Sequence, residues 1–506
     1  MAGTVLTGTI MAVLDTSIVN VAIPSMTGTL GASVEEIAWV VTGYILAQVI
    51  VMPITALLAE RFGRKNFYMF SVALFTLASM ACGLARTLPL VVLFRVLQGF
   101  GGGVVMTVSQ AILRETFPPA EQAMAMGIYG MGVVVAPAVG PTLGGWITDN
   151  WSWPWVFYVN VPVGIVNVLL VTRFIHDPPY LERRKGRIDW LGLALLAGGL
   201  GALQLMLEDG QREDWFQSGY IVALALASAL GLLLFVAQEL RADRPAVNLR
   251  ILKDRSFTSA TAIGGILGMG LYGTLFLLPL FLQNLLGYSA MLSGEALIPR
   301  SLAMAVVMPL GGRVYNRLGP KVLVGSGLLV SAYSFWELSR LTLEVGFWDI
   351  FWPQMWQGVG FALIFVALST AALATIPRPK MTQATGLYNV VRQVFGSVGI
   401  ASSATVLSRS VGRYQAVLGE HLTRFDPGVR GFLGAATVGM MQRGGDLATA
   451  RLQALALLRG KLTRQAAVLA YNHVFALVTL LFLFSVPLVL LLRSAGGDVD
   501  AGVTGE

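Results

Sequence analysis

Residues 56–65 read ALLAERFGRK, and residues 312–321 read GRVYNRLGPK. Three residues of the first stretch recur in the second at a constant offset of 256 positions: Arg61 as Arg317, Gly63 as Gly319, and Lys65 as Lys321. The same kind of match joins QGFG at 98–101 with QGVG at 357–360, and Gly140 with Gly396. A repeat of this length indicates that the chain consists of two related halves.

Fourteen segments are apolar and long enough to cross a membrane, which takes about 20 residues. The 506 residues are 55% hydrophobic and only 12% charged. A soluble core cannot hide this much apolar surface, so the bilayer is the expected solvent. We expect spans over residues 4–26, 37–58, 67–85, 88–112, 121–147, 155–173, 189–207, 219–239, 258–284, 291–312, 321–341, 349–375, 383–408 and 469–492. Six spans fall in each half, and the seventh and eighth form an inserted hairpin. The sequence therefore predicts an all-α polytopic membrane protein.

The positions of Lys and Arg predict how these spans are oriented. With a cytoplasmic N-terminus, the inside loops hold 20 of these residues and the short outside loops hold 3, so both termini are expected in the cytoplasm. The expected parts are an N-terminal six-helix half (1–173), a cytoplasmic linker (174–188), the inserted hairpin (189–239), a second cytoplasmic linker (240–257), a C-terminal six-helix half (258–492) and a cytoplasmic tail (493–506).

Residues 409–465 form a long loop that we expect on the outside, within the C-terminal half. Leu455, Leu458 and Leu462 recur there at helical spacing, which indicates an amphipathic helix. A solvated loop that only joins two spans is the alternative. Long loops weigh little in topology, so the basic residues of this one do not contradict the orientation.

Composition argues against several other classes of protein. The net charge of +8 follows from the loops beside the membrane, so nucleic acid is not an expected partner. Cys82 is the only cysteine, and His176, His421 and His473 are widely separated, so neither a metal site nor a nucleophile–base pair is visible. We therefore expect no enzyme activity, no metal and no cofactor.

Several stretches resemble one family. Residues 56–65 resemble a cytoplasmic loop motif, G-x-L-a-D-R-x-G-R-K, with Ala56 in place of its Gly and Glu60 in place of its Asp. LDTSIVNVAIP at 14–24 resembles L-D-x-T-I-V-N-V-A-L-P of a first span, and RVLQGFGGG at 95–103 resembles R-x-x-Q-G-x-G of a fourth.

Two further stretches strengthen the resemblance. APAVGPTLGG at 136–145 resembles the fifth-span motif G-x-x-x-G-P-x-x-G-G, and WPWVFYVNVPVG at 153–164 resembles the start of a sixth span. Taken together the chain resembles the major facilitator superfamily in its 14-helix drug:proton antiporter branch, and most closely the EmrB type. That fold places two parallel halves around an axis normal to the membrane, with substrate at the midplane.

The resemblance implies a function and partners. It implies a multi-pass protein of the bacterial inner membrane that exports hydrophobic or cationic drugs and is driven by the proton gradient. It also implies a periplasmic adaptor (membrane fusion protein) and a TolC-type outer-membrane channel as partners. The alternatives are a transporter of the same fold dedicated to one metabolite or siderophore-like compound, and a membrane enzyme or receptor.

Charged residues inside the spans are the expected proton-coupling groups: Asp15, Arg95 and Glu295. A charge at the centre of the bilayer costs roughly 2.5–3.5 kcal/mol, so Asp15 should face a partner or a cavity. Burial favours its neutral, protonated form, and the permanent cation Arg95 can shift that balance. The alternatives are a structural acid at Asp15, backbone bonding by Arg95, and a wet vestibule around Glu295, which could also pair with Arg300.

The motifs also nominate residues for three other roles. A latch on the cytoplasmic side would use Glu60, Arg61, Gly63, Arg64 and Arg317, although positive-inside charge explains part of this set. The antiporter motif contributes Pro137, Gly140, Pro141, Gly144 and Gly145, where simple close packing is the alternative. Apolar and aromatic walls with few polar anchors suit a promiscuous cavity, and the candidates are Tyr44, Gln48, Gln98, Tyr129, Tyr272, Phe276, Gln357, Phe361 and Asn389.

Overall fold

The computed structural model describes residues 1–177, 189–242, 245–423, 425–444 and 446–492, and these ranges contain helices but no strand. The helices are α1 (Ala2–Leu30), α2 (Val34–Phe62), α3 (Arg64–Leu84), α4 (Leu88–Thr116), α5 (Pro119–Asn150), α6 (Trp155–Tyr158), α7 (Asn160–Phe174), α8 (Trp190–Asp209), α9 (Gly219–Arg241), α10 (Arg255–Asn284), α11 (Ala290–Glu295), α12 (Ile298–Leu338), α13 (Phe347–Ala371), α14 (Met381–Glu420), α15 (Pro427–Gln442) and α16 (Leu447–Ser485). Most of the expected linker 174–188 and all of the expected tail 493–506 lie outside the described residues.

Thirteen helical segments of the described chain are long and apolar enough to cross a membrane. The difference from fourteen arises because one segment, Met291–Leu338, joins α11 and α12 and covers two expected spans, 291–312 and 321–341. Its backbone turns at Gly319, where φ is +74°, a left-handed conformation that glycine adopts without strain. With α12 divided there, each expected span has a helix, and the all-helical polytopic fold is confirmed.

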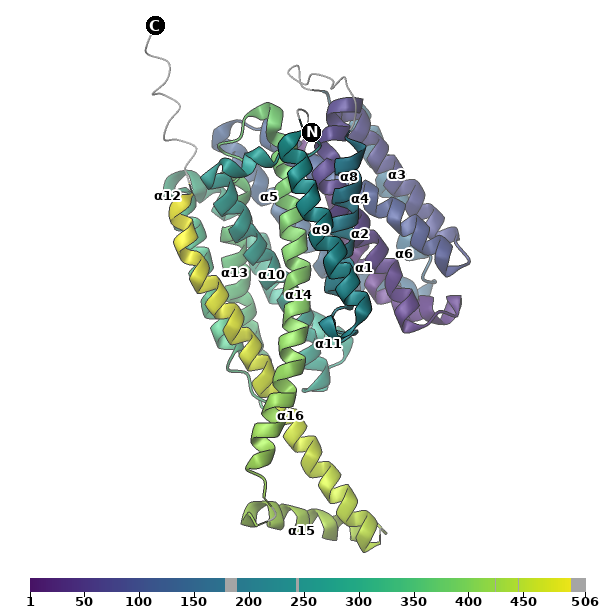
Figure 1. Cartoon of the computed structure of the whole chain (residues 1–506), viewed down its shortest axis with the longest axis vertical. Coiled ribbons are helices and arrows are strands. Elements are labelled where there is room, and N and C mark those ends of the chain that lie inside the picture. Colours follow the sequence, from purple (N-terminus) through teal and green to yellow (C-terminus); the bar gives the residue numbers. More distant parts are fainter. Residues whose placement is uncertain (178–188, 243–244, 424, 445, 493–506) are drawn as a thin grey trace.

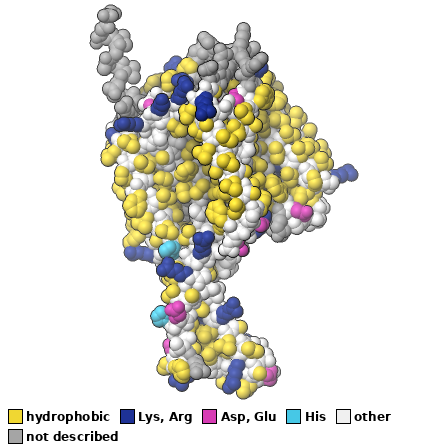
Figure 2. Space-filling view, in the orientation of Figure 1, with side chains coloured by type: hydrophobic (Ala, Val, Ile, Leu, Met, Phe, Trp, Pro, Cys, Tyr) yellow, Lys and Arg dark blue, Asp and Glu magenta, His cyan; other side chains and the backbone are white. Residues whose placement is uncertain are grey.

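The helices form one elongated bundle (Figure 1). In this view α1–α4 and α6 lie on one side and α10, α12 and α13 on the other, with α8 and α9 in front, while α5 lies on the second side and packs against α12. Figure 2 shows hydrophobic side chains over the middle of the body, with most Lys and Arg above and below it. We call the end where α1 begins the basic end, and the opposite end the stalk end.

The inserted hairpin of α8 and α9 packs beside the line where the two halves meet. Gln204 of α8 donates a hydrogen bond of 3.0 Å to the hydroxyl of Ser397 on α14. Trp215, beyond the end of α8, donates one of 2.8 Å to the hydroxyl of Thr405 on the same helix. The hairpin also contacts α2 of the N-terminal half, so it bridges the halves along one flank.

The halves meet tightly toward the basic end, where α2 packs on α14 and α5 packs on α12. A Cβ added at Gly127 of α5 would lie 2.5 Å from the carbonyl oxygen of Met308 on α12. A Cβ added at Gly386 of α14 would lie equally close, 2.5 Å, to the carbonyl oxygen of Met52 on α2. The two contacts are related by the repeat, and each leaves space only for glycine.

A stalk projects from the stalk end of the bundle, built from the end of α14, α15 and the start of α16 (Figure 1). The residues expected as a loop, 409–465, are therefore mostly helical. Asp426 accepts hydrogen bonds from two amides in the first turn of α15, and Asp446 does the same for α16. These caps explain why new helices begin there, and the outcome favours the helical alternative over a solvated loop.

Candidate proton-coupling site

A buried ion pair joins α1 and α4 in the N-terminal half. The guanidinium Nη1 of Arg95 lies 2.5 Å from the Oδ2 of Asp15, and neither side chain is exposed to solvent. The structure thus brings together two of the three expected coupling residues. Both come from the motifs at 14–24 and 95–103, which lie on helices that cross here.

Further hydrogen bonds hold each partner of the pair. The Oδ1 of Asp15 accepts from Gln98 at 2.8 Å and from Asn160 at 2.7 Å. Arg95 donates through Nε to the carbonyl oxygen of Val40 at 2.9 Å. An isolated buried ion pair seldom repays its desolvation, and these extra bonds to both charges offset part of that cost.

Tyr44 of α2 completes the surroundings of the cation. The guanidinium carbon of Arg95 lies 4.2 Å from the centroid of the Tyr44 ring, a cation–π distance. The Tyr44 hydroxyl donates to the carbonyl oxygen of Ala12 at 3.0 Å and accepts from Gln48 at the same distance. Three residues expected to bind substrate, Tyr44, Gln48 and Gln98, therefore belong to the network around the ion pair.

The chemistry of this network is asymmetric. A guanidinium keeps its proton at any physiological pH, whereas a carboxylate can be protonated. Protonation of Asp15 would leave a neutral acid beside a fixed cation, so the pair would lose most of its attraction. The pair therefore joins a group that can lose its charge to one that cannot, across α1 and α4.

The antiporter-motif residues connect α5 to the helix that carries Asp15. Pro141 has no N–H, so the carbonyl oxygen of Pro137 lacks its helical donor, and the hydroxyl of Ser17 donates to it at 2.9 Å. A Cβ added at Gly140 would lie 2.5 Å from the Ser17 hydroxyl, and one at Gly144 would lie 2.8 Å from the carbonyl oxygen of Ile18. The motif thus lets α5 lie directly against α1, two residues from Asp15.

The expected latch residues gather at the basic end, but in two separate groups. Arg64, at the start of α3, forms an ion pair with Glu115 near the end of α4. Glu60 instead accepts a 2.7 Å hydrogen bond from Gln383 at the start of α14, across the two halves. Gly63 adopts φ +85° between α2 and α3, and Arg317 is exposed beside the turn in α12.

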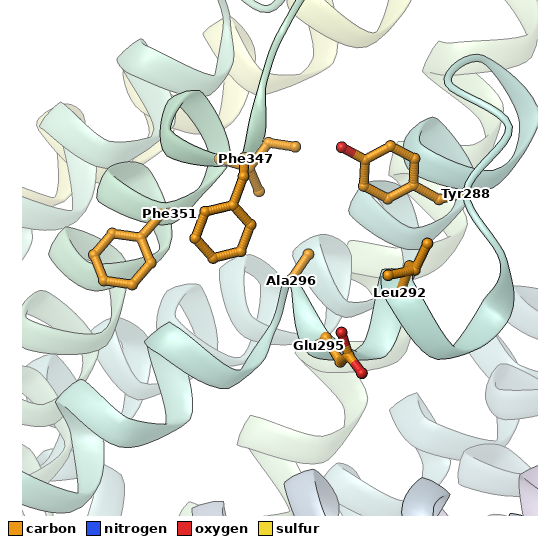
Figure 3. A pocket seen from close by; sticks show the side chains of 7 residues that line it. Tyr288, Leu292, Glu295, Ala296, Phe347 and Phe351 are labelled. Atoms are coloured by element: carbon orange, nitrogen blue, oxygen red, sulfur yellow. The ribbon is translucent and has the colours of Figure 1, made fainter.

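Glu295 lies apart from the ion pair, on α11 at the stalk end of the C-terminal half. It is exposed, while the buried Arg300 donates at 3.3 Å to Gln357 of α13. Glu295 borders a cleft of about 370 Å³ in which Tyr288 and Phe347 approach from different sides (Figure 3). The other side chains around this cleft are Leu292, Ala296, Ile350 and Phe351. One carboxylate among aromatic rings would suit a hydrophobic cation.

The remaining expected substrate residues divide between the core and the line where the halves meet. Phe361 is fully buried, with its ring stacked on that of Phe482 at a centroid distance of 6.0 Å. Phe276 is half-buried on α10, and Tyr272 donates to Gln393 of α14 at 3.4 Å. Two others lie at the border between the halves. Tyr129 is on α5, and Asn389 of α14 donates to Gln110 of α4 at 2.9 Å.

Sequence reasoning did not nominate Asn160, whose amide donates both to Asp15 and to the hydroxyl of Ser79, the latter at 3.0 Å. Asn160 begins α7 after the short α6. A polar side chain in an otherwise apolar span was the feature of the sequence that could have singled it out. Glu115 and Gln383, the partners of Arg64 and Glu60, were also missed. Their positions near helix ends give no sign of the helix they touch.

Comparison with known proteins agrees with this architecture. The chain is 35% identical over 492 residues to the fatty acid resistance protein FarB of Neisseria gonorrhoeae, covering 96% of this chain and 95% of that one. It is 33% identical over 483 residues to the multidrug export protein EmrB of Escherichia coli K12, covering 95% and 92%. Among solved structures, the human organic anion transporter MFSD10 (TETRAN) matches with a TM-score of 0.60 at 13% identity, over 95% of this chain and 98% of that one.

Two repeated bundles of membrane helices, with a charged pair buried inside one of them, define a secondary membrane transporter. Residues 5–400 match the family described as Major Facilitator Superfamily. The chain belongs to that superfamily, as the resemblance of its motifs indicated.

Proposed function

We propose that this chain is a proton-coupled exporter of hydrophobic toxic compounds, drugs among them. The observation that carries the proposal is the ion pair of Asp15 and Arg95, a protonatable acid buried beside a permanent cation. It is supported by the relatives named for multidrug export and fatty acid resistance, which align with nearly the whole chain.

In this mechanism a proton taken up by Asp15 weakens its contact with Arg95 and frees α1 to move. Because α5 lies against α1 through Gly140 and Gly144, a shift of α1 passes to α5. Because α5 in turn packs on α12 of the other half, the shift reaches the contact that closes the basic end. The driving force is the proton gradient, and no cofactor is invoked.

The proposal extends to location and partners. Its setting is the bacterial inner membrane, with the basic end and both termini in the cytoplasm, and the stalk in the periplasm. The stalk is offered as the docking surface for a periplasmic adaptor that leads to a TolC-type channel. Dedication to one metabolite or siderophore-like compound remains the competing function.

The test is efflux of a fluorescent dye from cells that express the chain, with and without an uncoupler. Gradient-driven export predicts dye loss that the uncoupler abolishes, and a panel of unrelated dyes separates broad from dedicated transport. A chain that moves none of the dyes, or moves them equally well with the uncoupler, would contradict the proposal.

A further inference from the structure

Besides Arg95 and Arg300, a further arginine lies within the membrane-spanning part, on α14. Arg392 is half-buried and lies far from either end of its helix. Its guanidinium carbon is 5.4 Å from the centroid of the Phe365 ring on α13 and 6.0 Å from that of Tyr388. Asn389, three residues before Arg392 on α14, donates to Gln110 of α4 in the N-terminal half at 2.9 Å. The cation therefore sits among aromatic rings where the halves meet.

Nothing on the helices around Arg392 supplies a negative charge at this depth. On α2, α4, α5, α8, α12, α13 and α14, every acidic residue lies within two residues of a helix end: Glu35, Glu36, Glu60, Glu115, Glu121, Asp149, Glu208, Asp209, Glu337, Asp349 and Glu420. α16, which also packs on α14, has no acidic residue. α10 carries no acidic residue at all, and Asp15 on α1 is held by Arg95. A charge at this depth is costly, so an arginine without a counter-charge is a binding-site candidate.

Hydrogen-bond donors exceed acceptors in the same region. The buried hydroxyl of Tyr388, one helical turn from Arg392, has no hydrogen-bond partner. Asn389 donates to the Oε1 of Gln110, which leaves the buried Nε2 of Gln110 without an acceptor. A fixed cation and spare N–H and O–H groups match a ligand that brings negative charge and acceptor oxygens.

We propose that Arg392 binds the carboxylate of an amphipathic organic acid, whose apolar part lies against the rings beside the guanidinium, those of Phe365 and Tyr388. This inference rests on the proposed export function and names the substrate class. A guanidinium binds a carboxylate through two parallel hydrogen bonds, and the single positive charge suits a monoanion. Organic cations would be repelled here, although the Glu295 cleft could accept them.

Binding of radiolabelled decanoate to the purified full-length chain tests the assignment without relying on transport. Arg392→Gln should weaken binding about tenfold or more, and Arg392→Lys should fall between, because lysine keeps the charge but loses the planar fork. Arg413→Gln is the matched control, since it removes an equal charge from an exposed position on the same helix and should bind as the unmodified chain does. Methyl decanoate, which lacks the charge, should not compete.

Three outcomes would overturn the inference: unchanged decanoate binding by Arg392→Gln, equal competition by the methyl ester, or no decanoate binding by the unmodified chain. If Arg392→Gln does not fold, Arg392→Lys and the ester competition still decide. Proteoliposomes with an imposed pH gradient separate the two proposals. Movement of ethidium but not decanoate would refute the carboxylate site alone, whereas movement of neither would refute the export function.

Discussion

Thr274 occupies in the C-terminal half the place that Asp15 occupies in the N-terminal half. Gln98 donates to Asp15 at 2.8 Å, and its repeat counterpart Gln357 donates to Thr274 at 3.3 Å. The counterpart of Arg95 is Gln354, a fully buried side chain whose nitrogen and oxygen have no hydrogen-bond partners. The two halves thus share the hydrogen bond but not the charges, so the proposed proton coupling involves the N-terminal half alone.

Replacing Asp15 by Asn should abolish gradient-driven efflux while the protein still folds. Asparagine resembles the protonated acid in shape and hydrogen bonding, so it would hold the site in one state of the proposed cycle. The measurement is dye efflux against protein amount in the membrane. Thr274→Val is the matched control in the other half and should keep efflux. Efflux by Asp15→Asn equal to that of the unmodified chain would show that Asp15 does not couple transport.

The sequence predicted the fold well because each span is a local property, readable from about 20 apolar residues. It also singled out Asp15 and Arg95, since an ionisable residue stands out in an apolar segment. It could not predict that Asn160 and the Val40 carbonyl complete the site, because these come together only when several helices pack. Likewise, nothing local distinguishes Arg392, which lacks an acidic neighbour, from Arg95, which has one.

Gly144 and Gly145 of the antiporter motif should respond differently to replacement by alanine. Gly144→Ala would place a Cβ 2.8 Å from the backbone oxygen of Ile18, whereas Gly145→Ala would place one 3.8 Å from Val21, an ordinary contact. Overpacking of this kind costs about 1–3 kcal/mol and forces helices apart. We expect Gly144→Ala to lose efflux and Gly145→Ala to keep it, as measured at equal expression. Loss of efflux in both variants would mean that the close approach to α1 is not the reason for the motif.

A reversible crosslink should test whether the basic end opens during transport. Glu60 and Gln383 meet through the ends of their long side chains across the halves, so cysteines at these positions lie within reach of a bis-methanethiosulfonate crosslinker, which a reductant cleaves. Cys82 is buried and should not interfere. Efflux should stop when the crosslinker is added and return on reduction, while each single-cysteine variant stays active throughout. Undiminished efflux by the fully crosslinked protein would argue that this contact stays closed in the cycle.

Labelling with a membrane-impermeant thiol reagent should establish the orientation. Tyr180→Cys lies in the expected cytoplasmic linker, outside the described residues, and should react only after the cells are opened. Gly434→Cys lies at an exposed position on α15 and should react in intact spheroplasts. The reason is the excess of Lys and Arg at the basic end, which favours the cytoplasmic side. Reaction of Tyr180→Cys from the outside would reverse the topology.

The stalk should be dispensable for transport itself and required for resistance of whole cells. A lone exporter would release an apolar compound into the periplasm, from where it can re-enter, so a docked adaptor and channel are needed for net protection. At the base of the stalk, Gln415 of α14 donates to Thr463 of α16 at 3.1 Å, which joins its two long helices. Arg464 donates to the carbonyl oxygen of Leu285 at 2.7 Å, which joins the stalk to the body.

Replacing residues 417–461 by a short Gly/Ser linker would keep both of these contacts and remove the projecting helices. The basic side chains that would be lost, such as Lys461 over the ring of Phe432 at 4.4 Å, are the ones offered to an acidic adaptor surface. We expect the shortened chain to transport normally in vesicles but to lose both resistance and crosslinking to the adaptor. A matched variant that reverses the charge of Arg451 and Arg459, both exposed on α16, should weaken crosslinking without shortening the stalk. Full resistance in cells with the shortened chain would leave the stalk as a connection between α14 and α16 and nothing more.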